Sequence, residues 1–115
     1  MDTAEALCRA AKLLGIGTAN MQVLPSDAAG QLTPATLRNA LDREPDRPTI
    51  VVLQGGDVNC GVFDPFPELI ALAHGAHAWV HIDGAMGLWC NAVPELRHLL
   101  AGAELADSWA TDGHK

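Results

Sequence analysis

Two stretches of the sequence carry the residues best suited to chemistry: His81-Ile-Asp-Gly-Ala-Met-Gly87 and Asp107-Ser-Trp-Ala-Thr-Asp-Gly-His-Lys115. An apolar run leads into Asp83, and a polar turn leads into His114 and Lys115. A lysine amine forms a Schiff base with an aldehyde, and a carboxylate can hold a proton on the ring nitrogen of a cofactor. This pair of residues therefore indicates Schiff-base chemistry with a protonated pyridine ring, the chemistry of pyridoxal phosphate.

The hydrophobic pattern predicts the elements that must position these residues. Its spacing indicates helices at 3–14, 34–41, 65–75 and 94–102, and strands at 21–24, 49–53, 77–83 and 105–111. Such an alternation predicts an α/β fold of three α/β/α layers around a largely parallel sheet. The unbroken β-branched run at 49–53 is typical of a strand that is covered on both faces.

The predicted topology brings the chemical features to one edge of the sheet. Asp83 ends one predicted strand, the glycine-rich loop Gln54–Gly61 follows another, and Lys115 comes just after a third. Parallel sheets bind ligands beyond the carboxyl ends of their strands. We therefore expect a ligand site at this edge. The glycines match neither a dinucleotide-binding fingerprint nor a P-loop.

Composition excludes several classes of function. The 115 residues allow one domain, and 49% hydrophobic residues predict a real core. A net charge of −7 with scattered basic residues argues against nucleic-acid and anionic membrane partners. No apolar run reaches the length of a membrane span. An acid near the N-terminus, where a signal peptide is basic, and three cysteines without a C-x-x-C pair predict a cytoplasmic protein with reduced thiols.

The two stretches together resemble the cofactor core of the group II pyridoxal-phosphate-dependent decarboxylases, which include the glutamate, aromatic amino acid and histidine decarboxylases. The resemblance implies the large domain of a fold-type I enzyme that decarboxylates an amino acid, a small-molecule substrate, with pyridoxal 5'-phosphate. It assigns Lys115 to the internal aldimine and Asp83 to the pyridinium proton. Family active sites form at a dimer interface, so a homodimer is implied.

The length of the family's members gives a further expectation. They are several times longer than this chain, which ends on Lys115. Residues 1–115 are therefore expected to be a single partial domain, a central slice of the large domain truncated at both ends and inactive by itself. The histidine that stacks on the cofactor in this family has no counterpart here, because no histidine precedes His74.

The resemblance also implies further cofactor contacts. Ala85 would pack under the ring, and His114 would lie near the phosphate or the Schiff base. Asn59 would reach the 3-hydroxyl group or the substrate. Asp112 departs from the family, in which many members have a neutral donor there, so it is given no contact. Ser108 and Thr111 are candidate phosphate donors, although hydroxyl groups in turns more often bond to local backbone.

Two other readings stay open. The same acid and lysine occur in other fold-type I enzymes, such as aminotransferases, aldolases and desulfurases. A non-enzymatic α/β module that binds a partner or a metal is the other alternative. His77 and His81 share a face of the predicted strand with Asp83, and His74 lies nearby in sequence. This set could hold zinc, but we assign no metal ligand.

Overall fold

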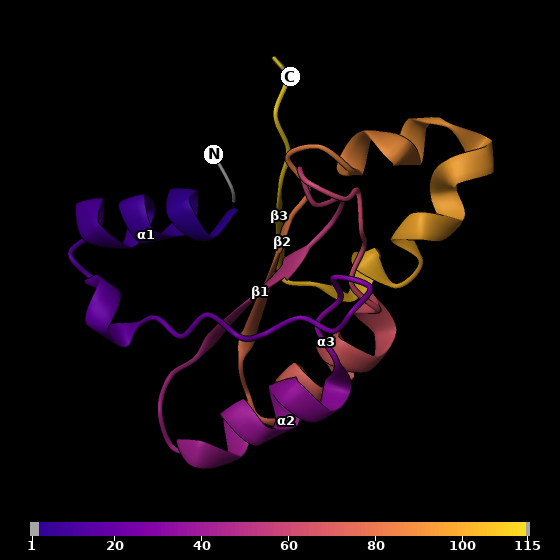
Figure 1. Ribbon diagram of the computed structural model, residues 1–115. Helices are drawn as coiled ribbons and strands as arrows, with labels where there is room; N and C mark the ends of the chain where they lie inside the picture. Colours follow the sequence, from indigo (N-terminus) through magenta and orange to yellow (C-terminus); the bar gives the residue numbers. More distant parts are fainter. Residues whose placement is uncertain (1–2, 115) are drawn as a thin grey trace.

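The structure is a computed structural model that describes residues 3–114. Its longer helices are α1 (Thr3–Leu13), α2 (Pro34–Arg43) and α3 (Phe66–Gly75), and its strands are β1 (Ile50–Gln54), β2 (Trp79–Asp83) and β3 (Ser108–Ala110) (Figure 1). Short 3-10 helices complete the order: η1 (Thr18–Asn20), η2 (Leu88–Ala92), η3 (Pro94–Leu100) and η4 (Ala103–Leu105).

The three strands form one parallel sheet in the order β1-β2-β3. The register pairs Gln54 with Asp83 and Asp83 with Ala110, so all three strands end at the same edge. The predicted parallel sheet is thus confirmed. None of the helices among the described residues has both the length and the apolar character that a bilayer crossing requires.

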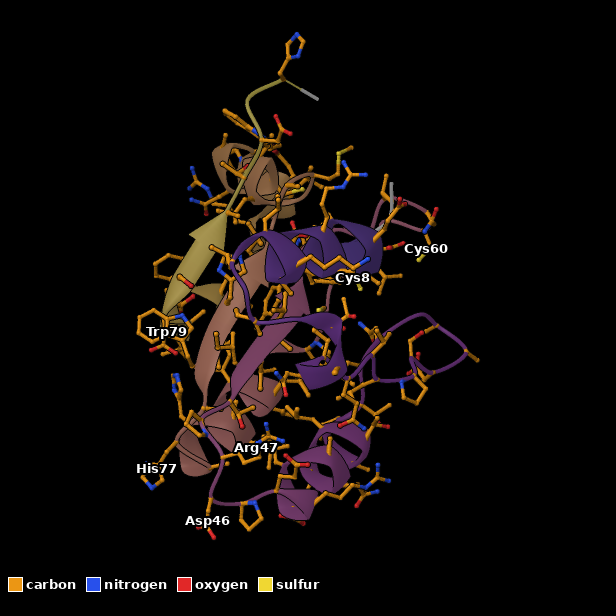
Figure 2. All side chains as sticks on the ribbon, turned by 90° about the vertical axis from the view of Figure 1, so that its left-hand side faces the viewer. Cys8, Asp46, Arg47, Cys60, His77 and Trp79 are labelled. Atoms are coloured by element: carbon orange, nitrogen blue, oxygen red, sulfur yellow. The ribbon has the colours of Figure 1, made fainter. Side chains whose placement is uncertain are left out.

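The core lies between one face of the sheet and the helices α2 and α3. Val51, Leu53, Val80 and Ile82 alternate onto this face and pack with the buried side of α3 and with Leu37 of α2. Figure 1 shows the sheet between α3 on one side and α1 on the other. Figure 2 shows α1, which carries Cys8, in front of the sheet. The layering predicted from the sequence is confirmed.

The second face of the sheet is less covered than the sequence predicts. Ile50 is 62% exposed and Trp79 is 53% exposed, so burial alternates along both strands. The expectation of a strand covered on both faces is wrong for the described residues. The reason is that α2 and α3 pack on one face only, and α1 leaves Ile50 and Trp79 in solvent.

Other element boundaries also differ from the prediction. Residues 21–24 run extended but form no strand, and Pro25, which lacks an N–H, follows directly. The helix predicted at 94–102 is the 3-10 helix η3, closed by bonds such as Leu96 N–H to Val93 O at 2.9 Å. The last strand is three residues long, because η4 takes up Leu105.

His77 lies in a turn and not in a strand. Its φ is 58°, in the left-handed region. Its N–H bonds to His74 O at 3.0 Å, and Ala78 N–H bonds to Ala73 O at 2.9 Å. This is the Schellman pattern that ends many helices, with histidine at the position glycine usually occupies. The predicted strand at 77–83 therefore begins two residues late, and His77 and His81 do not share a face of it.

Candidate functional site at the carboxyl edge of the sheet

The loops that follow the strands are joined to one another by backbone hydrogen bonds. Gly55 N–H bonds to Asp83 O at 2.8 Å, and Gly84 N–H bonds to Ala110 O at 2.8 Å. These bonds continue the parallel ladder past the ends of the strands. The loop after β1, the turn after β2 and the segment after β3 consequently meet at one edge, as the sequence predicts.

Asp83 lies half-buried at the end of β2. Its side chain lies on the sheet face of Trp79 and His81, opposite to the buried Val80 and Ile82. Its Oδ1 accepts the N–H of Ala85 at 3.1 Å. The carboxylate is thus oriented by its own turn while remaining accessible at the edge where a ligand would bind. Ala85, which follows, is also half-buried.

Glycines allow the loops after β1 and β2 to touch through their backbones. A Cβ added at Gly87 would stand 2.1 Å from the carbonyl oxygen of Gly55, and one added at Gly56 would stand 2.8 Å from Cα of Gly87. Such distances leave no room for a side chain. The glycines of this loop therefore permit close packing next to Asp83.

The segment after β3 is tied to the turn after Asp83. Asp112 N–H bonds to Ala85 O at 3.3 Å, and Trp89 of η2 donates its indole N–H to Asp112 O at 2.8 Å. The side chain of Asp112 turns back on its own turn, where Oδ1 accepts His114 N–H at 2.9 Å. His114 itself is exposed. Lys115, the predicted Schiff-base lysine, lies outside the described residues.

Two predicted contacts occupy other positions. Ser108 is bonded within the sheet, since its Oγ accepts the indole N–H of Trp79 at 2.9 Å and lies 2.8 Å from Nδ1 of His81. Asn59 is exposed in the loop after β1, next to Cys60, which Figure 2 shows at the periphery. The structure thus brings Asp83, Ala85 and the turn before Lys115 together, whereas Asn59 lies in the exposed part of the loop after β1.

Asp57 organises that outer loop. Its Oδ1 accepts the N–H groups of Asn59 and Cys60 at 2.9 and 3.0 Å, and the thiol of Cys60 at 3.1 Å. The thiol and the backbone bonds of Cys60 hold the pKa of the Asp57 carboxyl below its ordinary range. The same carboxylate raises the pKa of the Cys60 thiol. The Cys60 thiol therefore ionises less readily than an ordinary thiol. The bonds from Asn59 and Cys60 to Asp57 form an Asx turn that holds the loop.

The side chains of the three candidate metal-binding histidines do not converge on one site. Nε2 of His74 lies 2.9 Å from Oδ2 of Asp107, and His81 is paired with Ser108. His77 is exposed, and Figure 2 shows it toward the opposite end of the molecule from Cys60. Within residues 3–114, no three metal-ligating side chains gather. The described part of the chain therefore gives the zinc alternative no ligand set.

Sequence reasoning missed the bond from Trp89 to Asp112, described above, and the role of Asp64. Asp64 is only 7% exposed, and its carboxylate accepts Leu32 N–H at 2.9 Å and Gln54 N–H at 2.8 Å. Burial raises the pKa of this carboxyl, against the opposing effect of the two backbone bonds. Its position before a proline predicts a helix cap, but the helix begins after Pro65 without a side-chain cap. No local signal distinguishes these two uses.

Comparison with known proteins identifies the family. The sequence pattern described as the pyridoxal-dependent decarboxylase conserved domain matches residues 2–115. The chain belongs to the pyridoxal-dependent decarboxylase family. Pyridoxal phosphate is therefore the cofactor of the family to which it belongs, and the expected α/β fold is that of its solved relatives.

Named relatives share the same segment. Aromatic-L-amino-acid decarboxylase of Cavia porcellus is 37% identical over 103 residues, which are 87% of this chain and 22% of that protein. The apo crystal structure of mouse CSAD superposes with a TM-score of 0.89 at 29% identity, over 95% of this chain and 24% of that one. Oryza sativa TDC with PLP gives a TM-score of 0.83 at 34% identity, over 93% and 24%. The chain thus spans about a quarter of the length of these relatives.

The residues of the carboxyl edge fit pyridoxal phosphate. A half-buried carboxylate that accepts one backbone N–H has acceptor capacity left for a ring N–H. The small side chain of Ala85 follows it, and two loops pack through glycines beside it. These features provide a polar anchor for a ring nitrogen, with a small side chain next to it. Asp83, Ala85 and the turn at 111–114 are the described residues that would hold the group.

Proposed function

We propose that this chain contributes the cofactor-binding core of a pyridoxal-phosphate-dependent decarboxylase that acts on an amino acid. The observation that carries the proposal is the placement of Asp83 at the carboxyl edge, with the turn that leads to Lys115 bonded to Ala85. Family membership supports the reaction class. Because the chain covers about a quarter of its relatives, the activity of the whole protein is part of the proposal.

Each residue has a proposed role. Lys115 provides the amine that binds the cofactor aldehyde, and Asp83 holds a proton on the ring nitrogen. Ala85 leaves room for the ring, and the turn at 111–114 orients Lys115 and His114. When bound, pyridoxal phosphate supplies an electron-accepting ring for the electrons released as carbon dioxide departs. The hydrogen bond from Ala85 N–H holds the Asp83 carboxylate in the orientation proposed for its contact with the ring nitrogen.

The first experiment measures cofactor attachment. The full-length protein is mixed with pyridoxal phosphate, its absorbance is recorded, and borohydride reduction is followed by peptide mapping. We expect a reduced adduct on Lys115. Lys115→Ala should abolish the adduct, whereas Lys12→Ala, at an exposed lysine of α1, should leave it unchanged. An adduct mapped to another lysine would contradict the proposal.

A second experiment tests Asp83. Asp83→Asn keeps an acceptor for Ala85 N–H but cannot hold a proton on the ring nitrogen as a charged partner. We expect the adduct on Lys115 to persist and the rate of carbon dioxide release to fall by several orders of magnitude. Asp46→Asn, at an exposed loop position, is the control. Wild-type turnover in Asp83→Asn would remove Asp83 from the mechanism.

One relative favours a second candidate reaction. The 4-hydroxyphenylacetaldehyde synthase of Rhodiola rosea is 33% identical over 112 residues. Its name indicates an aldehyde product. The full-length protein should therefore be assayed with aromatic and acidic amino acids for carbon dioxide, amine and aldehyde together. Amine as the main product supports the decarboxylase; aldehyde as the main product supports this alternative.

The assembly and the location are further proposals. The family resemblance supports a homodimer, and three cysteines without a C-x-x-C pair support a cytoplasmic location. Sedimentation of the full-length protein would detect the dimer, and fractionation of the source cells would locate it. A monomer that turns over substrate would overturn the proposed assembly.

A further inference from the structure

Each of the three tryptophans of this chain donates a hydrogen bond that involves residues 103–112. Trp79 donates its indole N–H to Ser108 Oγ at 2.9 Å, Trp89 donates to Asp112 O at 2.8 Å, and Trp109 donates to Ala103 O at 2.8 Å. All three rings are about half exposed. A half-exposed indole is amphipathic, so its N–H can be bonded while part of the ring stays wet. In each bond, at least one partner lies between Ala103 and Asp112.

The bond from Trp89 is the one that reaches past the sheet. Strand β3 ends at Ala110, so no strand ladder holds the residues that follow. Among residues 3–114, Asp112 also donates its N–H to Ala85 O at 3.3 Å, and its Oδ1 accepts His114 N–H at 2.9 Å. The bond to Ala85 is long for N–H···O geometry, and the bond to His114 lies within the turn. Trp89 therefore makes a short hydrogen bond that connects this turn to η2.

The geometry also relates Trp89 to Asp83. Trp89 lies in η2, which directly follows the turn that carries Asp83 and Ala85. Leu88 N–H bonds to Gly84 O at 3.1 Å, so the start of η2 is attached to that turn. A bond from Trp89 to Asp112 consequently sets the separation between the Asp83 turn and the turn that leads to Lys115.

We propose that Trp89 is a positioning residue whose indole N–H fixes the turn at 111–114 relative to Asp83 and Ala85. Its effect on the lysine rests on the proposed function; its effect on the turn does not. Loss of this N–H should loosen the turn and slow attachment of pyridoxal phosphate at Lys115, while the sheet and the core stay intact. Trp79 and Trp109 fasten β3 itself, so they provide matched controls.

The first test needs no cofactor. Hydrogen exchange is measured on full-length wild type, Trp89→Phe and Trp109→Phe. Because a neutral hydrogen bond contributes modestly to stability, we expect the amides of Asp112 and His114 to exchange about fivefold faster in Trp89→Phe. Trp109→Phe should leave these two amides unchanged. Equal exchange in wild type and Trp89→Phe would overturn the proposal.

A second variant covers the case in which Trp89→Phe disturbs folding. Benzothienylalanine at position 89 keeps the two fused rings and replaces the N–H by sulfur. We expect the same faster exchange at Asp112 and His114, with an unchanged melting temperature. A wild-type exchange rate in this variant would show that ring packing, and not the N–H, holds the turn, which would also overturn the proposal.

The last test measures the consequence for the site. The rate at which the Lys115 adduct forms is measured by trapping with borohydride. This rate is divided by the amount of pyridoxal phosphate bound, so that a change in binding does not alter the ratio. We expect this ratio to fall about fivefold in Trp89→Phe and to be unchanged in Trp109→Phe. An unchanged ratio in Trp89→Phe, with a normal wild-type adduct, contradicts the positioning role. Absence of the adduct from wild type contradicts the proposed function instead, and the exchange experiment then decides the role of Trp89 in the turn.

Discussion

Three aspartates of this chain differ in how many donors bind them, and this difference separates structural from chemical roles. Asp64 accepts two backbone N–H groups from distant segments, and Asp107 accepts Val80 N–H and pairs with His74. Asp83 accepts a single N–H, from its own turn. Carboxylates have capacity for several donors. Among these three, Asp83 is therefore the one best able to accept a donor from a ligand.

The lowered pKa of the Asp107 carboxyl predicts how the free energy of unfolding depends on pH. The N–H of Val80, and next the ring of His74, hold the pKa of its carboxyl below the ordinary value of 3.8. A carboxyl with a lowered pKa in the folded state stabilises the fold above its unfolded pKa, and this contribution is lost as the pH falls through the folded pKa. We therefore expect the free energy of unfolding to fall below about pH 4, and less steeply in Asp107→Asn.

Urea unfolding between pH 2 and pH 7 measures this dependence. Asp42→Asn, at an exposed position of α2, is the control and should keep the wild-type slope. The same acid dependence in wild type and Asp107→Asn would show that the bonds to Val80 and His74 contribute nothing to it.

At the scale of the element, the end of α3 carries a strained residue. His77 has a φ of 58° in the Schellman turn, a conformation that costs a residue with a Cβ about 1–2 kcal/mol. We expect His77→Gly to stabilise the protein by about 1 kcal/mol, because glycine adopts this conformation freely. Ala76→Gly, one residue earlier and at φ −96°, should be destabilising. Urea unfolding of both variants checks the prediction, and destabilisation by His77→Gly would contradict it.

The contact between two loops gives a second prediction at this scale. A methyl group at Gly87 would stand 2.1 Å from Gly55 O, and its φ of −90° is ordinary, so the cost of Gly87→Ala is steric. We expect a loss of about 1–3 kcal/mol and weaker binding of pyridoxal phosphate. Gly75→Ala, at the end of α3 where an added Cβ meets no atom within 4 Å, should weaken neither. Thermal unfolding and a cofactor titration measure both, and a wild-type result for Gly87→Ala would show that the loops can separate.

The sequence predicts the elements with strong local signals and misses those set by tertiary contacts. Thr33 before Pro34 predicts the start of α2, and the side chain of Thr33 indeed accepts Thr36 N–H at 3.2 Å. The edge that carries Asp83 follows from strand order alone. In contrast, the role of Asp64 depends on Leu32 and Gln54, and that of Trp89 on Asp112. Pairings across such distances leave no periodic pattern, so local reasoning cannot find them.

At the scale of the whole molecule, the sheet has one covered and one partly open face. Neighbouring residues of β1 differ sharply, since Ile50 is 62% exposed and Val51 is 7% exposed. Both are β-branched, so the sequence alone cannot separate them. A pair of matched substitutions can: Ile50→Thr and Val51→Thr each place a hydroxyl group where a methyl or ethyl group lay, and both keep a branched Cβ suited to a strand.

The layering predicts opposite outcomes for the two variants. Val51→Thr buries a hydroxyl group in the hydrophobic core and should cost about 1–3 kcal/mol. Ile50→Thr exchanges solvent-exposed surface and should change stability by less than about 0.5 kcal/mol. Urea unfolding of this 115-residue chain gives both values. The same measurement on the full-length protein tests whether other parts of the protein cover this face. If they do, Ile50→Thr should lower the free energy of unfolding strongly in the full-length protein and not in the 115-residue chain. Equally small changes in both would mean that the face stays open.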